Sequence, residues 1–108
     1  MTRFLVFALA LALAGAAQAR GSAAAGKQKA SQICAACHGP AGVEPSAPEN
    51  PILAGQHYDY LVRALRDYKS GKRDNAVMKG FAASLSQQDI EDLAAWFASQ
   101  QSGLHYQR

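Results

Sequence analysis

The stretch Cys34-Ala35-Ala36-Cys37-His38 decides how this chain folds. Two thiols three positions apart can add to the two vinyl groups of haem and form thioethers. The histidine that follows the second cysteine is then held beneath the iron as a ligand. The pattern therefore predicts one covalently attached haem c per chain, bound through Cys34 and Cys37, with His38 as the proximal metal ligand.

Three other chemistries use the same residue types. A thioredoxin-like redox pair needs a βαβ context, and the sequence shows no strand pattern. A disulfide across two intervening residues closes almost no chain and stabilises little. A zinc site would lack its fourth ligand, because there is no second CxxC and no HxxxH. Haem attachment fits best, and a thiol oxidoreductase that uses free Cys34 and Cys37 is the alternative for a chain without haem.

A six-coordinate haem iron needs a second ligand on its other face. We predict Met78, which is the one methionine of the mature chain if the N-terminal segment is removed. Met78 lies in the glycine-containing stretch 75–81, where an irregular backbone could cross a haem face. The alternatives are a methionine that only fills a gap in the core, or ligation by His57 or His105. His57 directly precedes a predicted helix, and His105 lies in the C-terminal tail.

Residues 1–19 have the layout of a secretory signal peptide. Arg3 gives a positive start, Phe4 to Ala14 is an unbroken apolar run, and 17–19 form an A-x-A cleavage site. The run is short for a permanent membrane helix, although an uncleaved anchor is the alternative. Residues 20–108 are then expected to form one domain after export to the periplasm.

The mature chain is small and nearly neutral once haem is bound. Without Arg3 the sequence has ten basic residues against eight acidic ones, and two haem propionates would offset this excess. We therefore predict no nucleic-acid partner. Large apolar side chains are scarce, and so small a domain buries a limited share of its surface. A haem in the middle of the fold would supply the missing core.

The patterns along the mature chain predict an all-α fold, with three main helices and long loops wrapped around the haem. The first helix is expected at 26–34, after a frayed start at 21–25. The second, at 58–70, places apolar residues on one face and ends at Gly71. The third begins at a capping box at Ser86 and runs to about residue 100. Proline and glycine density predicts a loop over 39–56, and 72–85 is also expected to be irregular.

The residues from about Gly26 to Gln100 resemble a class I c-type cytochrome. They are most similar to the soluble bacterial cytochrome c-553 group and to the single-haem halves of two-haem periplasmic cytochromes. The matching residues are Gly26, Cys34 to Gly39, Asn50 to Gln56 (Asn-Pro-Ile-Leu-Ala-Gly-Gln), Tyr60, Leu61, Tyr68, Gly71, Arg73, Met78 and the helix Leu85 to Gln100.

The resemblance implies two further roles. The backbone carbonyl of Pro51 would accept a hydrogen bond from the unligated nitrogen of His38 and fix its tautomer. Gly26 would lie against Leu93 and Trp96 at a close crossing of the first and last helices.

Ligation by His38 and Met78 leaves no coordination position open to a substrate. We therefore expect a soluble, monomeric periplasmic electron carrier that is not an enzyme and transfers one electron between respiratory-chain partners. These partners would be redox proteins such as a membrane-bound donor complex and a terminal oxidase or reductase, each docked transiently. The alternative is a peroxidase-like or gas-binding protein with Met78 detached. Lys72, Arg73 and Lys79 could steer acidic partners to the haem edge.

Overall fold

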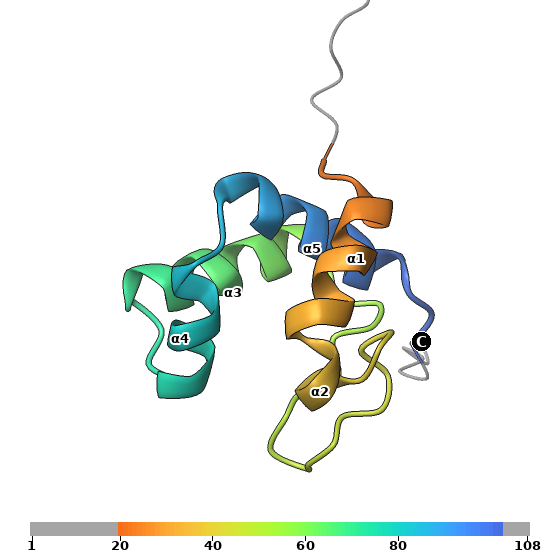
Figure 1. The fold of residues 1–108 in the computed structure, drawn as a ribbon, viewed down its shortest axis with the longest axis horizontal. Coiled ribbons are helices and arrows are strands. Elements are labelled where there is room, and N and C mark those ends of the chain that lie inside the picture. Colours follow the sequence, from red (N-terminus) through yellow and green to blue (C-terminus); the bar gives the residue numbers. More distant parts are fainter. Residues whose placement is uncertain (1–19, 103–108) are drawn as a thin grey trace, which may run out of the picture.

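The computed structural model describes residues 20–102, and the helices found there confirm the predicted all-α class. In chain order they are α1 (Ala23–Ile33), α2 (Ala35–His38), α3 (Tyr58–Ser70), α4 (Ala76–Ala83) and α5 (Gln87–Ser99) (Figure 1). No strand occurs among residues 20–102. The signal-peptide prediction for residues 1–19 and the prediction for His105 lie outside the described residues.

Helix α1 begins earlier than the sequence pattern predicts. The expectation of a frayed segment at 21–25 is wrong, because Ser22 caps the helix with its hydroxyl, which accepts a hydrogen bond from the backbone N–H of Ala25 at 3.2 Å. The N–H of Ser22 donates in turn to a carboxylate oxygen of Asp92 on α5 at 2.7 Å. A contact with a distant residue therefore fixes this start, which a local pattern does not reveal.

Helices α3 and α5 follow the predicted pattern closely. Gly71 ends α3 in the left-handed conformation, with φ of 82°, which glycine adopts without steric cost. At the start of α5, the hydroxyl of Ser86 accepts from the Asp89 N–H and the Asp89 carboxylate accepts from the Ser86 N–H. The capping box expected at Ser86 is therefore confirmed.

The stretch 72–85 contains a helix that the sequence analysis did not predict. Residues 76–83 form α4, and its N-cap is Asn75, whose side-chain oxygen accepts a hydrogen bond from the N–H of Met78 at 2.9 Å. An N-cap asparagine satisfies a backbone donor that a short helix otherwise leaves free. The expectation of an irregular stretch overlooked this cap and is wrong for residues 76–83. Met78 therefore lies on a helical turn.

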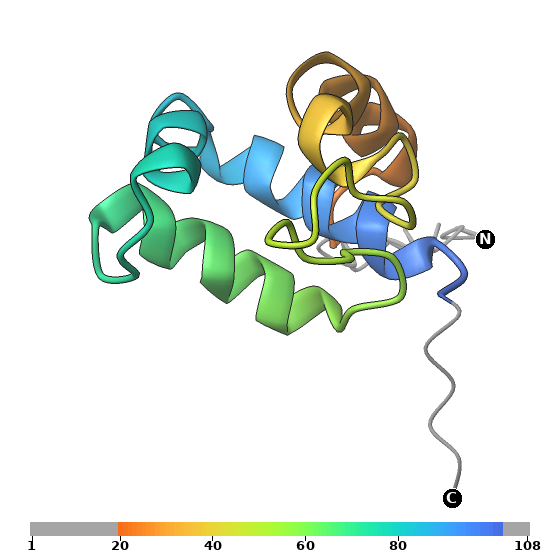
Figure 2. The same cartoon turned by 90° about the horizontal axis from the view of Figure 1, so that it is seen from below.

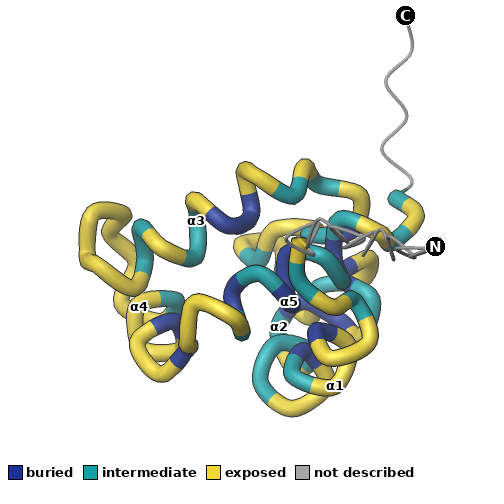
Figure 3. Tube along the Cα trace, turned by 90° about the horizontal axis from the view of Figure 1, so that it is seen from above, coloured by how far each residue is buried: buried dark blue, intermediate teal, exposed yellow. Residues whose placement is uncertain are grey.

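The core is small and centred on α5. Helix α5 has five buried residues, which are Ile90, Asp92, Leu93, Ala94 and Phe97. Buried positions gather along this helix in Figure 3. Ile90 and Leu93 are the largest side chains that are fully buried among the described residues. The protein chain alone therefore provides little apolar packing, as its composition predicted.

The helices form two groups on either side of α5. Figure 2 shows α3 and α4 on one side, with α1, α2 and the loop 39–56 on the other and α5 running between them. Within residues 20–102, no helix is both long and apolar enough to cross a membrane.

Candidate haem site

A cavity of about 640 Å³ lies between these elements, and it is lined mainly by apolar side chains. This volume is within the usual range for cofactor sites. All five residues predicted from the sequence line it: Cys34, Cys37, His38, Pro51 and Met78. The fold thus brings together residues that are up to 44 positions apart in the chain.

The short helix α2 arranges the CxxCH residues. The N–H of His38 donates to the carbonyl of Cys34 at 3.0 Å, and that of Gly39 donates to the carbonyl of Ala35 at 2.9 Å. Residues three and four positions apart lie on one face of such a turn. Cys34, Cys37 and His38 therefore all face the cavity from one wall.

The ring of His38 is held in a defined orientation. The side chain is 6% exposed, and its Nδ1 lies 2.9 Å from the carbonyl oxygen of Pro51. A carbonyl only accepts hydrogen bonds, so Nδ1 carries the proton and Nε2 keeps a free lone pair. This geometry makes Nε2 the nitrogen available to a metal.

The loop that carries Pro51 is attached to the cysteine motif itself. The N–H of Ser46 and the side-chain amide of Asn50 both donate to the carbonyl of Cys37, at 3.0 and 3.1 Å. Asn50 therefore positions Pro51 relative to His38, a role that the sequence analysis did not assign. The signal was present, since an asparagine directly precedes the proline.

Met78 reaches the cavity from α4, away from the wall that holds His38. It is half-buried, and its position on the helix is set by the Asn75 cap. Its rival His57 is exposed at the N-cap of α3 and is not among the cavity-lining residues. Of the described candidates for a second ligand, the fold brings Met78 to the cavity and leaves His57 outside.

The environment of the thiols disfavours thiol redox chemistry. Burial, and to a lesser degree the neighbouring Cys37, raises the pKa of Cys34 to about 11. Reactive thiols of oxidoreductases have lowered pKa values, because the thiolate is the nucleophile. A Cys34 thiol would stay protonated at neutral pH, so the geometry does not favour the alternative of a thiol oxidoreductase.

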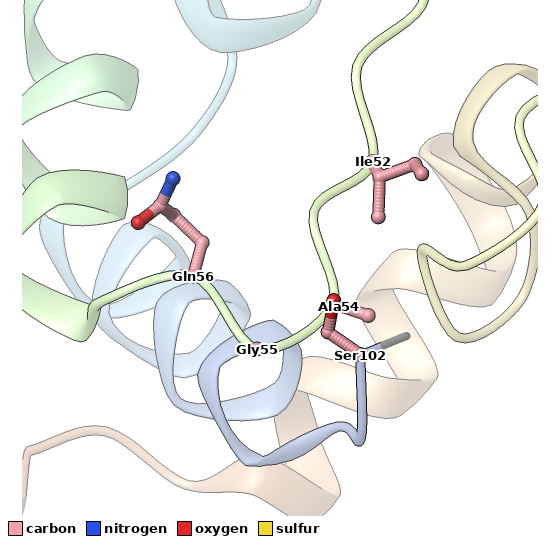
Figure 4. A pocket seen from close by; sticks show the side chains of 5 residues that line it. All are labelled: Ile52, Ala54, Gly55, Gln56 and Ser102. Carbon is pink, nitrogen blue, oxygen red and sulfur yellow. The ribbon is translucent and has the colours of Figure 1, made fainter. Parts of the chain in front are cut away.

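A second hollow, of about 110 Å³, lies beside residues 52–56 and is shown in Figure 4. It is lined by Ile52, Ala54, Gly55, Gln56 and Ser102. Ile52 and Gln56 also line the large cavity, so the two spaces share part of a wall. The small hollow offers none of the thiol, imidazole and thioether groups that c-type haem sites use, so the large cavity is the candidate cofactor site.

Comparison with known proteins identifies the family. The family described as "Cytochrome C oxidase, cbb3-type, subunit III" matches residues 21–97. The chain belongs to this family of c-type cytochromes. It is 50% identical to cytochrome c4 of Pseudomonas aeruginosa over 101 residues, which are 93% of this chain and 49% of that protein. It is 42% identical to cytochrome c-554(548) of Halomonas halodenitrificans over 84 residues, 75% of this chain and 99% of that protein.

The crystal structure of reduced cytochrome c4 from Pseudomonas stutzeri has the same fold. It superimposes with a TM-score of 0.71 at 41% identity, covering 80% of this chain and 49% of that one. The chain thus spans about half the length of the cytochrome c4 relatives that it matches. The predicted class I cytochrome c fold is confirmed.

Membership of this family implies covalently bound haem c, and the residues of the cavity fit that group. Two thiols on one helical turn, an imidazole with Nε2 free and a thioether all border one largely apolar space. Thiols, imidazole and thioether are the donors that c-type haem sites use.

Proposed function

We propose that the chain is a one-electron carrier whose low-spin haem c is attached through Cys34 and Cys37 and ligated by His38 and Met78. The observation that supports this most strongly is the meeting of all four side chains at one cavity, with Nε2 of His38 free. Bound haem supplies the redox chemistry, because its iron alternates between the ferric and ferrous states.

The residues of the chain orient and shield that group. Pro51 holds the ring of His38, while the cap at Asn75 holds the turn that carries Met78. The apolar lining, which includes Leu61, Leu65 and other side chains of α3, α4 and α5, excludes water. If His38 and Met78 both bind the iron, no coordination position would remain for a substrate, so the proposal is an electron-transfer protein and not an enzyme.

The proposal places this carrier in the periplasm, after removal of residues 1–19 and attachment of haem on the far side of the membrane. Its partners would be other redox proteins, such as a membrane-bound donor and a terminal oxidase or reductase. The exposed residues Lys72, Arg73 and Lys79 lie around the segment that leads to Met78 and would favour acidic surfaces on those partners. The carrier is proposed to act as a soluble monomer that docks transiently.

Spectroscopy of the purified holoprotein tests this function. We expect low-spin haem in both oxidation states and no binding of carbon monoxide by the reduced protein, because both axial positions are filled. High-spin haem that binds carbon monoxide would instead support a peroxidase-like or gas-binding protein. A colourless product with two free thiols would support the thiol oxidoreductase. Either result would overturn the proposed carrier.

A further inference from the structure

The carbonyl of Cys37 lies in the last turn of α2, where a helix leaves its carbonyls without an intrahelical partner. Three donors of the loop 39–56 meet at this oxygen. They are the N–H of Ser46 at 3.0 Å, the side-chain amide of Asn50 at 3.1 Å and the hydroxyl of Ser46 at 3.4 Å. A carbonyl oxygen has two lone pairs, so the two shorter contacts satisfy it. Asn50 therefore makes the stronger of the two side-chain contacts to this carbonyl.

The peptide bond between Cys37 and His38 is thereby held on both sides. Its carbonyl accepts from Asn50, while its N–H donates to the carbonyl of Cys34 at 3.0 Å. The imidazole of His38 donates from Nδ1 to the carbonyl of Pro51 at 2.9 Å. Because Asn50 and Pro51 are adjacent, these contacts close a ring that runs from the backbone of His38 to its own side chain. The amide of Asn50 completes this ring.

Proline transmits the position of Asn50 to the carbonyl that follows. The pyrrolidine ring fixes φ of Pro51 and restricts Asn50 to extended backbone, so few rotations remain between the two contacts. The base of the loop is closed separately, by the N–H of Leu53, which donates to the carbonyl of Gly42 at 2.9 Å. Loss of the Asn50 amide should therefore loosen the carbonyl of Pro51 without opening the loop.

We propose that Asn50 is a positioning residue that strengthens the donation of His38 to the haem iron and thereby lowers the reduction potential. This inference rests on the proposed function, since it requires His38 to ligate the iron. A firm hydrogen bond from Nδ1 raises the basicity of Nε2, because the ring gains anionic character. A more basic imidazole stabilises ferric iron more than ferrous iron. The potential is therefore lower when the carbonyl of Pro51 is held in place.

The choice of readout follows from the place of Asn50 on the cavity wall. Its side chain is uncharged, so a neutral substitution changes no charge beside the cofactor. The polarity of the wall does change, and polarity also affects a reduction potential. The deciding measurement is therefore made on the Nδ1 proton of His38, which reports the hydrogen bond to Pro51 itself.

Nuclear magnetic resonance of the ferrous holoprotein measures these hydrogen bonds through the exchange of their protons with water. A proton exchanges when its hydrogen bond opens. In the wild type, we expect the side-chain amide of Asn50 to exchange more slowly than that of the exposed Gln28. Equal exchange at the two amides would show that Asn50 is not held, and it would overturn the inference without any substitution.

The variant Asn50→Leu removes the amide and keeps a side chain of similar size. We expect the Nδ1 proton of His38 to exchange about 2- to 10-fold faster, because the lost hydrogen bond stabilised the closed ring. The potential should rise while the haem stays low-spin. Ser46→Ala is the matched control, since it removes the longer contact to the same carbonyl and keeps the backbone N–H at 3.0 Å. Both readouts should stay near the wild type in this control. Asn50→Ala provides the same test if leucine disturbs the loop.

The outcomes separate this inference from the proposed function. If Asn50→Leu and Asn50→Ala keep the wild-type exchange of the His38 proton, Asn50 is merely structural and the inference fails, whatever the stability or potential. The carrier would still stand. An equal acceleration in Ser46→Ala would assign the effect to the loop as a whole and would also overturn the role of Asn50. Loss of low-spin haem in the wild type would reject the proposed function first.

Discussion

Gly26 of α1 packs directly on the backbone of Asp92 in α5. A Cβ atom at Gly26 would overlap the carbonyl oxygen of Asp92 and would lie 2.9 Å from Cβ of Trp96. The same Asp92 accepts the hydrogen bond from Ser22 at the start of α1. This crossing fixes α1, and α1 leads directly into the turn that carries Cys34 and His38. A crossing whose own residues do not line the cavity thus sets the position of the haem motif.

Gly26→Ala should therefore destabilise the holoprotein by about 1–3 kcal/mol, because the added methyl group forces the two helices apart. Unfolding by guanidinium chloride, followed at the haem absorption, measures this change. Gly80→Ala is the matched control, since a Cβ at Gly80 in α4 meets no atom within 4 Å. That control should be neutral or more stable by up to about 1 kcal/mol, because alanine favours the helix. Equal stability of both variants would show that the crossing tolerates a side chain.

Met78→Ala should remove the sulfur-to-iron charge-transfer band of the ferric protein and lower its reduction potential. The reason is that thioether ligation favours the ferrous state. The open position should also allow carbon monoxide to bind the ferrous form. His57→Ala is the control, because His57 lies outside the cavity, and its spectrum should match the wild type. If the band persists in Met78→Ala, Met78 is not the sulfur ligand.

Asp89→Asn should reveal the contribution of the capping box in a pH-dependent way. The hydrogen bond from the backbone N–H of Ser86 is the main cause that lowers the pKa of Asp89 below its ordinary 3.8. The hydroxyl of Ser86 and the charge of Lys29 lower this pKa further. A lowered folded-state pKa stabilises the protein above the unfolded pKa, and this stabilisation is lost as pH falls through the folded value. We expect a loss of about 0.3–1 kcal/mol at pH 7.

The difference between Asp89→Asn and the wild type should vanish in acid, once the carboxyl group is protonated. Urea unfolding at several pH values measures it. Asp59→Asn, in the first turn of α3 where there is no capping box, is the matched control and should show a smaller effect at pH 7. An undiminished difference at pH 2.5 would mean that the ionised carboxylate of Asp89 contributes nothing.

Much of this molecule could be predicted from local patterns. The CxxCH motif, the apolar face of α3 with Gly71 at its end and the capping box of α5 each depend on residues close together in the chain. The features that escaped prediction depend on distant contacts or weak signals. The early start of α1 needs Asp92, which is 70 residues away from Ser22. Helix α4 depends on a single asparagine cap in a stretch that also contains glycine.

The candidate haem site shows the same division between features set by local residues and features set by distant contacts. The candidate ligands can be chosen by residue type, because few thiols, imidazoles and thioethers are present. Their meeting is a property of the tertiary fold, and so is the exclusion of His57. The hydrogen bond from Asn50 to the carbonyl of Cys37 left only a weak local signal, the asparagine that directly precedes Pro51.

The double substitution Cys34→Ala and Cys37→Ala should leave the mature chain largely unfolded. Only Ile90 and Leu93 are large and fully buried among the described residues. Without haem, the apolar side chains around a cavity of about 640 Å³ would face water instead of a macrocycle. Burial of apolar surface contributes about 25 cal/mol per Å², so a core this small cannot offset the entropy cost of ordering the chain.

Far-ultraviolet circular dichroism and urea titration measure this outcome. We expect low helix content and no cooperative transition in the double variant, against a sigmoidal transition in the wild-type holoprotein. The single variant Cys34→Ala is the control, because one thioether and His38 still hold the haem in place. It should fold, with a midpoint below that of the wild type. A cooperative transition in the haem-free double variant at the wild-type midpoint would show that the protein core suffices without the cofactor.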